Sequence, residues 1–272
     1  MIAELYFPGF PLNQFIDRFF YYKDVNPANS IDRFLPDGDV HLIFELTGNP
    51  QYIYDNDTLE EKQACKEVWF SGIRNKCITI PSGKDSEMFI IFFHKGQSYP
   101  FLEMPVDTLT DHVVHGRDVL PRDFLFLREE LQNIESIGGK FAKAEAYFIQ
   151  FYQRKLILNP CVMFAVKQIL SSPHQLTIKA LSDKIGYSQK HFIHQFSSHV
   201  GLTPKGFLKV MRFQKAIKEI EILKDSDWNR VAYESGFYDQ SHFINEFKLF
   251  SGCTPTEYLR MRSDNLNYLA VG

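Results

Sequence analysis

Two short stretches near the C-terminus carry polar side chains, at helical spacing, that are suited to nucleic-acid binding. They are Lys190, His194 and Ser197 in the first stretch, and Ser241, Asn245 and Lys248 in the second. Amide, imidazole and hydroxyl groups can exchange hydrogen bonds with base edges, whereas ammonium groups pair with phosphates. A single lysine of this kind is often an ordinary solvated residue, so the interpretation depends on the elements that hold the two stretches.

The two stretches belong to a segment that occurs twice. The offset between the copies is 50 residues from Gly186 to Gly236 and 51 residues from Phe192 to Phe243, so the turn of the second copy holds one extra residue. A protein-binding repeat scaffold usually needs three or more copies to bury a continuous core. Two matched copies instead indicate a module that binds two neighbouring segments of one DNA duplex.

Local signals predict that each copy is a helix, a tight turn and a second helix. In the first copy a helix over 178–185 meets Gly186, which can adopt φ > 0 and end it. Ser188 is a favourable N-cap for the next helix. Phe192 and Phe196 lie four residues apart, so they share one buried face. The second copy repeats these features with a helix over 228–235, Gly236, Asp239, Phe243 and Phe247.

Each copy closes with a glycine and a Thr-Pro pair, which end one helix and open the next. These residues are Gly201 and Thr203-Pro204 in the first copy, and Gly252 and Thr254-Pro255 in the second. Together with Leu181-Ser182, Phe207-Leu208, Arg212, Ala216, Val231-Ala232, Ser241-His242 and Tyr258-Leu259, they give residues 176–262 a specific pattern. This segment resembles the C-terminal DNA-binding domain of the AraC/XylS family of bacterial transcription regulators.

The resemblance implies seven helices, with a long central helix over about 204–223 that joins two readers of successive major grooves. The positions that would face the groove are Lys190, Ile193 and His194 in the first copy, and Ser241, Ile244 and Asn245 in the second. Asn245 is suited to adenine, His194 to guanine or phosphate, and the isoleucines to a thymine methyl group. Many members of the family carry Arg where this chain has His194 and Asn245, which weakens the expectation of guanine readout there.

The C-terminal part of the chain carries a net positive charge, as DNA binding requires. Residues 176–262 hold 13 Lys and Arg against 9 Asp and Glu, a net charge of +4 in a chain whose total is −3. Phosphate contacts require such a local positive balance, although +4 is small. The side chains that we expect to contact phosphates are Lys179, Lys205, Arg212, Gln240 and Lys248.

The first hundred residues predict a β domain. Strands are expected over 41–46, 68–73, 77–80 and 88–93, where β-branched and aromatic residues dominate. The last of these is apolar at every position, so both of its faces should be covered. Residues 55–67 are polar and are expected to form an exposed loop.

This part resembles, more loosely, the N-terminal domain of one AraC-type branch. The residues that carry the resemblance are Leu35-Pro36-Asp37-Gly38, Leu42-Ile43-Phe44, Phe70-Ser71-Gly72, Phe92-Phe93, Gly96, Tyr99-Pro100-Phe101 and Leu109-Thr110-Asp111. The resemblance implies a cupin-like β domain and no established ligand chemistry.

Enzymatic and metal-binding functions find little support in the sequence. His41, Glu45 and His94 are the potential ligands that a barrel would bring together, but no His-x-His pair occurs, so core or surface histidines are favoured. Phosphate-binding glycine loops and the Gly-x-Ser-x-Gly motif are missing from the sequence. The cysteine cluster of the DNA-repair methyl acceptors in some AraC-like chains is missing as well. We therefore expect no enzyme, no metal and no cofactor.

The expected location is the cytoplasm. The sequence has no apolar run of 18 residues, and its first residues lack the basic start and apolar centre of a signal peptide. The four cysteines, Cys65, Cys77, Cys161 and Cys253, are scattered, as expected for reduced thiols.

A helical linker is expected between the domains, over 121–155. Phe124, Leu127 and Leu131 give the first helix an apolar stripe, Gly138-Gly139 breaks the pattern, and a second helix resumes over 141–158. The stripe either packs onto its own domain or pairs with a second copy in a dimer, and both alternatives stay open. Asn159-Pro160 should open the first C-terminal helix, and Ser171-Ser172-Pro173-His174 should end it.

The sequence therefore predicts an α+β protein with three parts: a β-rich sensing or regulatory domain over 1–115, a helical linker over 116–158, and an all-α domain with two helix-turn-helix motifs over 159–272. The expected function is sequence-specific transcription regulation, with activation favoured over repression. The expected partners are double-stranded DNA, RNA polymerase, a small-molecule effector and a second copy of the chain, but not a membrane. The alternative is a protein-interaction adaptor that keeps the helical fold without binding DNA.

Overall fold

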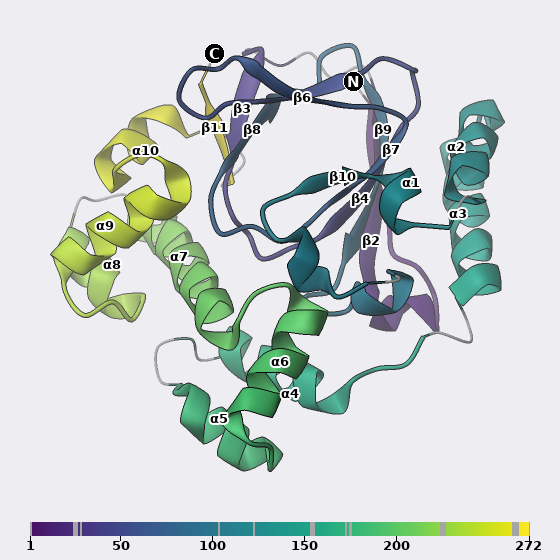
Figure 1. Cartoon of the computed structure of the whole chain (residues 1–272). Helices are drawn as coiled ribbons and strands as arrows, with labels where there is room; N and C mark the ends of the chain where they lie inside the picture. Colours follow the sequence, from purple (N-terminus) through teal and green to yellow (C-terminus); the bar gives the residue numbers. More distant parts are fainter. Residues whose placement is uncertain are drawn as a thin grey trace.

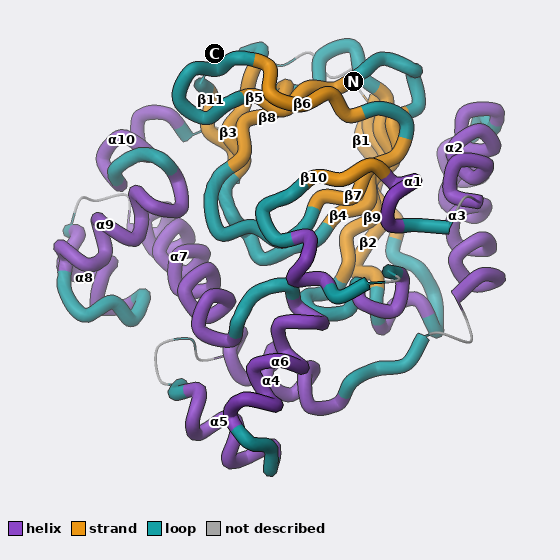
Figure 2. Tube along the Cα trace, in the orientation of Figure 1, coloured by secondary structure: helices purple, strands orange, loops and turns teal. Residues whose placement is uncertain are grey.

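The structure is a computed structural model that describes residues 2–23, 27, 29–102, 104–121, 123–152, 156–171, 173, 176–223, 227–262 and 267–271 (Figure 1). It has an N-terminal β domain and a C-terminal helical domain, so the predicted α+β class is confirmed. The strands gather in one half of the molecule, with α2 and α3 on the right of them, α7 to α10 on the left and α4 to α6 below (Figure 2).

Two antiparallel sheets form the β domain. The first has the order β1-β2-β9-β4-β7-β10 and the second has the order β11-β3-β8-β5-β6. The strands of the first sheet are β1 (Ile2–Tyr6), β2 (Ile16–Lys23), β4 (His41–Glu45), β7 (Val68–Ser71), β9 (Glu87–Phe93) and β10 (Val113–His115). Those of the second are β3 (Ile31–Phe34), β5 (Gln51–Tyr54), β6 (Glu61–Cys65), β8 (Ile78–Pro81) and β11 (Tyr268–Ala270).

Both faces of β9 are covered, as its continuous apolar sequence predicts. Phe89 and Ile91 join the main core, which the first sheet shares with the helices. Met88 and Ile90 face a smaller cluster around Trp69. The alternation of side chains along a strand explains why one apolar run can serve two cores.

The expected loop over 55–67 is wrong in its second half, because Glu61–Cys65 forms strand β6. This strand pairs antiparallel with β5 and is the end strand of its sheet. Its first two residues are exposed, and only Cys65 is buried. Main-chain pairing with a neighbour therefore overrides a polar composition that disfavours a strand.

The linker helices α2 (Asp123–Asn133) and α3 (Ile137–Tyr152) cover the first sheet. Phe124, Leu127 and Leu131 are buried, and the ring of Phe124 packs against Phe44 of β4 at 6.3 Å between centroids. The predicted stripe is thus covered within the chain itself. The break between the helices precedes Ile137 rather than falling at Gly138-Gly139, which lie in the first turn of α3.

Some expected helical positions lie outside the described residues. They are Gln153, Arg154 and Lys155 in the second linker helix, and Ser172 and His174 at the end of the next helix. Where the description resumes, Leu156 to Leu158 are not helical, so the expected helix over 141–158 is wrong at its C-terminal end. The short elements α1 (Gly116–Val119), η1 (Leu12–Gln14), η2 (Tyr99–Phe101) and η3 (Val106–Leu109) complete this part.

The helical domain runs from α4 to α10 within the described residues. Its helices are α4 (Pro160–Ser171), α5 (Ile178–Ile185), α6 (Gln189–Val200), α7 (Pro204–Leu223), α8 (Trp228–Glu234), α9 (Gln240–Ser251) and α10 (Pro255–Met261). The long central helix therefore has the predicted bounds. After α10 the chain returns to the β domain, where β11 pairs antiparallel with β3, a contact that the sequence did not indicate.

We predict that Phe247→Ala lowers the free energy of unfolding of the helical domain by about 3–5 kcal/mol, because it empties a core position. The side chain of Phe247 is 0% exposed and packs against the rings of Phe213, Phe243 and Tyr258. Leu249→Ala, on the same helix but 63% exposed, should change stability by less than about 0.5 kcal/mol. Urea denaturation measures both, and equal losses would contradict the assigned buried face.

Candidate nucleic-acid interface

The first reader consists of α5, a tight turn and α6. Thr177 caps α5 by accepting a hydrogen bond from the Ala180 amide at 3.1 Å, and Gly186 ends it with φ of 78°. Ser188 then accepts from the His191 amide at 3.3 Å and opens α6. Gly186 and Ser188 therefore act where the sequence predicts, and Thr177 provides a cap that was not predicted.

The second reader repeats this construction with α8 and α9. Asp227 caps α8 and Asp239 caps α9, the latter by accepting from the His242 amide at 2.7 Å. Gly236 takes φ of 79° in the turn, and Gly252 takes φ of 76° after α9. The two readers thus share their local geometry despite the extra residue in the second turn.

All six positions expected to face bases lie on α6 and α9, and five of them lie away from the buried phenylalanines. Lys190, Ile193, His194, Ser241 and Asn245 are exposed, whereas Ile244 is half-buried and packs on the main core. Ile193 is 37% exposed and so presents an apolar surface to solvent. Among the described residues, the polar side chains of this set have no hydrogen-bond partner, which leaves them available to a ligand.

The five expected phosphate contacts differ in their surroundings. Lys179, Lys205 and Lys248 are exposed, and Gln240 is half-buried at the start of α9. Arg212 instead lies half-buried on α7, where its Nε donates to the Pro173 carbonyl at 2.9 Å. Burial lowers the pKa of this guanidinium below its ordinary value. The structure thus gives Arg212 a role in holding α7 to the segment after α4.

The central helix α7 packs against both readers. Phe207, near its start, contacts Phe196 of α6 at 5.8 Å between ring centroids, and Phe213 contacts Phe247 of α9 at 5.1 Å. Lys209 adds an ion pair with Glu246 of α9 at 2.8 Å. A single helix therefore fixes the separation and orientation of the two outward polar faces.

The β domain also contacts both readers, which sequence reasoning missed. At the first reader, Tyr99 stacks on His199 at 4.1 Å between ring centroids, and the Thr110 hydroxyl donates to the Gly201 carbonyl. At the second, the Cys77 amide donates to the Phe250 carbonyl at 2.9 Å. No sequence pattern singles out the residues that make these contacts.

A third contact joins the β domain to α7 through the loop before β4. The side-chain amide of Gln214 donates to the Pro36 carbonyl at 2.7 Å. Gly38 follows with φ of 80°, and a Cβ at this position would lie 2.4 Å from the Cε atom of Met211. The loop therefore touches the helix that spaces the two readers.

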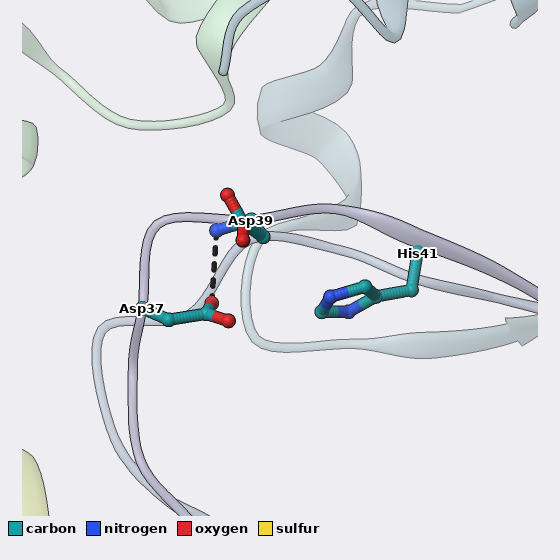
Figure 3. A group of neighbouring side chains, drawn as sticks. All are labelled: Asp37, Asp39 and His41. Carbon is teal, nitrogen blue, oxygen red and sulfur yellow. Dashed lines mark hydrogen bonds between the residues drawn. The ribbon is translucent and has the colours of Figure 1, made fainter. Parts of the chain in front are cut away.

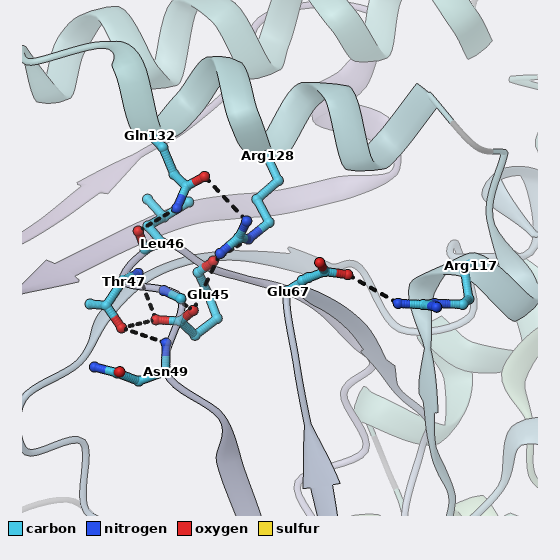
Figure 4. A network of polar contacts seen from close by, with 9 residues as sticks. Glu45, Leu46, Thr47, Asn49, Glu67, Arg117, Arg128 and Gln132 are labelled. Carbon is cyan, nitrogen blue, oxygen red and sulfur yellow. Dashed lines mark hydrogen bonds and ion pairs between the residues drawn. The ribbon is translucent and has the colours of Figure 1, made fainter.

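Two of the three residues that the sequence suggested as potential metal ligands, Glu45 and His94, have separate partners. The buried carboxylate of Glu45 accepts from the Thr47 and Gly48 amides at 2.6 and 2.7 Å and pairs with Arg128 at 3.5 Å, while Glu67 and Arg117 form a separate ion pair (Figure 4). His94 is partly exposed, and its ring contacts the Asn13 carbonyl at 3.1 Å. These interactions satisfy both groups without a metal ion.

His41 lies instead beside Asp37 and Asp39, a grouping that sequence reasoning missed (Figure 3). The spacing Asp37-Gly38-Asp39-Val40-His41 was the available signal. Burial raises the pKa of Asp37 to about 7 and lowers the pKa of His41 to about 4. At the edge of the β domain, Asp37 is half-buried and His41 is buried.

Both halves of the chain are similar to known families. A profile described as a helix-turn-helix domain matches residues 181–261, and a domain of unknown function (DUF6597) matches residues 4–115. The HTH-type transcriptional activator RhaS of Escherichia fergusonii is 30% identical over 88 residues, which cover 32% of this chain and 31% of that protein. The probable thc operon regulatory protein of Rhodococcus erythropolis is 29% identical over 128 residues, covering 46% and 39%. The chain thus spans only about a third of the length of these curated relatives.

Two solved structures are also similar. ToxT from Vibrio cholerae has a TM-score of 0.47 at 13% identity, covering 90% of this chain and 99% of that one. The C-terminal domain of AraT from Geobacillus stearothermophilus has a TM-score of 0.36 at 24% identity, covering 40% and 90%. Among the described helices, none has both the length and the apolar character needed to cross a bilayer.

We predict opposite effects for two glycine-to-alanine substitutions. Gly186→Ala should lower the free energy of unfolding by about 1–2 kcal/mol, because alanine resists positive φ. Gly138→Ala, in the first turn of α3, should raise it by about 0.4–1 kcal/mol through the lower entropy of the unfolded chain. A Cβ meets no atom within 4 Å at either position, so only backbone conformation differs. Denaturation curves measure both changes, and a shift of the same sign would refute this explanation.

Proposed function

Since its C-terminal domain belongs to the AraC/XylS family, we propose that this protein is a transcription regulator that recognises a specific DNA sequence with two readers. The observation that carries the proposal is the pair of outward polar faces on α6 and α9, held by one helix. Phosphate contacts by lysines would position the protein, and a few side chains would read bases. Activation, as in the relative named an activator, is the proposed direction of regulation, with RNA polymerase as a partner.

The geometry of α7 supports simultaneous binding by both readers. A helix of 20 residues is about 30 Å long at 1.5 Å per residue. Neighbouring half-sites on one face of DNA lie about 34 Å apart. The length of α7 therefore matches one helical turn of B-DNA, so that α6 and α9 would enter successive major grooves.

The β domain is proposed to sense a signal and to pass it to the readers. A cleft of about 790 Å³ lies between the β domain and α4. Arg18 and Lys95 of the β domain and Lys167 of α4 line it, together with apolar side chains of α4 such as Met163 and Val166. A small molecule that bound there would contact both domains. It would favour those arrangements of the two domains in which the shape of the cleft fits it best.

The direct test is binding of the full-length protein to its own promoter. We predict a footprint with two protected segments about one helical turn, or 34 Å, apart. Affinity should fall steeply between about 50 and 200 mM salt, because phosphate contacts release cations. If neither the promoter nor a selected random duplex shows salt-sensitive binding, the chain is a protein-interaction adaptor that uses the same helical fold.

Substitutions on α9 should separate base reading from phosphate contact. We predict that Asn245→Ala lowers affinity for the preferred site by about 1–3 kcal/mol and relaxes the preference at one base position. Lys248→Ala should weaken binding to all sequences alike and reduce the salt slope by about one. Anisotropy measurements across a library of sites distinguish the two patterns.

The matched control for charge is Lys62→Ala. This lysine is exposed on β6, in the β domain, and should leave both affinity and salt slope unchanged. An unaltered base preference in the Asn245→Ala protein would show that Asn245 does not read DNA. Loss of the salt slope in the Lys62→Ala protein would show instead that the contacting surface lies on the β domain.

A further inference from the structure

We propose that Asp37, Asp39 and His41 form a binding site for a divalent transition-metal ion at the edge of the β domain that faces α7. The proposal is independent of the DNA-binding function above, since it concerns different residues and a different ligand. It also departs from the expectation of the sequence, which grouped His41 with Glu45 and His94 and predicted no metal site.

The geometry brings three donor atoms together. One carboxylate oxygen from each aspartate and one ring nitrogen of His41 lie within 4.8 Å of one another. The Asp39 amide donates to Asp37 Oδ1 at 2.9 Å, which holds the turn, and the His41 ring points toward the two carboxylates (Figure 3). A metal ion would lie about 2.0–2.2 Å from each donor atom, so the three donor atoms must come closer to one another than 4.8 Å when it binds. Small rotations of the aspartate side chains would bring them closer.

A second observation points to a missing ligand at this position. His41 is only 9% exposed, and its Nε2 atom has no hydrogen-bond partner among the described residues. The ring is held by Phe92 at 4.6 Å and by Phe34 at 6.0 Å between centroids, so the imidazole is fixed in an apolar setting. Buried polar nitrogens normally have a partner, and a metal ion would supply one.

Lys95 is the group with which the ion must compete. Its ammonium pairs with the Asp39 carboxylate and donates to the Asp37 carbonyl at 3.0 Å. A lysine therefore already supplies one positive charge beside two carboxylates. Its side chain is 22% exposed and also lines the cleft against α4, so it has space to move away when an ion binds. Arg18 is not a comparable competitor, because it pairs with Asp17 and lies over the ring of Phe92.

The donor set indicates the class of metal. One imidazole and two carboxylates suit Zn²⁺, Mn²⁺ or Fe²⁺ better than Ca²⁺ or Mg²⁺, which prefer oxygen ligands alone. Three protein ligands would leave a coordination position for water. Asp37 of the site directly follows Pro36, whose carbonyl accepts from Gln214 of α7, so a bound ion would brace the loop that contacts the spacer helix.

The test is titration of the full-length protein with Zn²⁺ and, separately, with Mn²⁺ by calorimetry, in the absence of DNA. We expect one ion per chain and a binding constant at least tenfold weaker in Asp39→Asn, which is partly exposed and should fold normally. His41→Gln should also weaken binding. The informative variant is Lys95→Gln, which should bind the ion more tightly because it removes the competing ammonium.

His112→Gln is the matched control, because His112 is exposed on a different segment of the β domain and should leave binding unchanged. A chain that binds neither ion would overturn the proposal. An unchanged binding constant in the Asp39→Asn protein would place the ion elsewhere, for example on the cysteines. This result would also overturn the proposal. Weaker binding in Lys95→Gln would show that Lys95 and the aspartates form only a structural ion pair. None of these outcomes depends on whether the protein binds DNA.

Discussion

The arrangement of this protein depends on the packing of one helix, α7, between two bundles of aromatic rings. Phe207 and Phe213 are 0% exposed and lie about 1.7 helical turns apart, each against a different reader. Burial of large apolar side chains supplies most of the free energy that stabilises such a contact. Because both contacts are made by a single rigid element, neither reader can change its orientation without disturbing the side chains that it shares with α7.

The β domain adds to this constraint, because it contacts α7 and both readers. Its contacts reach the C-terminal end of α6, the C-terminal end of α9 and the middle of α7. A further connection between the two domains is strand β11, which follows the helical domain in the sequence and pairs with β3 of the β domain. The readers and α7 are thus held by hydrogen bonds to main-chain carbonyls and by ring stacking, whose geometry is more specific than that of apolar contact alone.

Local chemistry made the helical domain predictable from the sequence. Gly186 and Gly236 adopt positive φ, Ser188 and Asp239 cap the following helices, and α7 has its expected bounds. Features that depend on distant partners were not predictable. Strand β6 is polar and forms only because β5 offers a pairing edge, and β11 lies at the opposite end of the sequence from β3. The grouping of His41 with Asp37 and Asp39 likewise depends on the conformation of the loop before β4, which the hydrophobic pattern of the sequence does not predict.

The continuity of the core has a consequence for how a signal would travel. One cluster of buried side chains includes Phe89 of the β domain, Phe148 of the linker and Phe213 of α7, without a polar boundary between them. Close-packed interiors resist gradual deformation, so a ligand in the cleft or at the edge of the β domain would act by selecting between discrete packings. The loop over 36–39 is suited to that role, because it carries Asp37 and Asp39 and its Gly38 lies against Met211. A displacement there would act on α7, and through α7 on both readers at once.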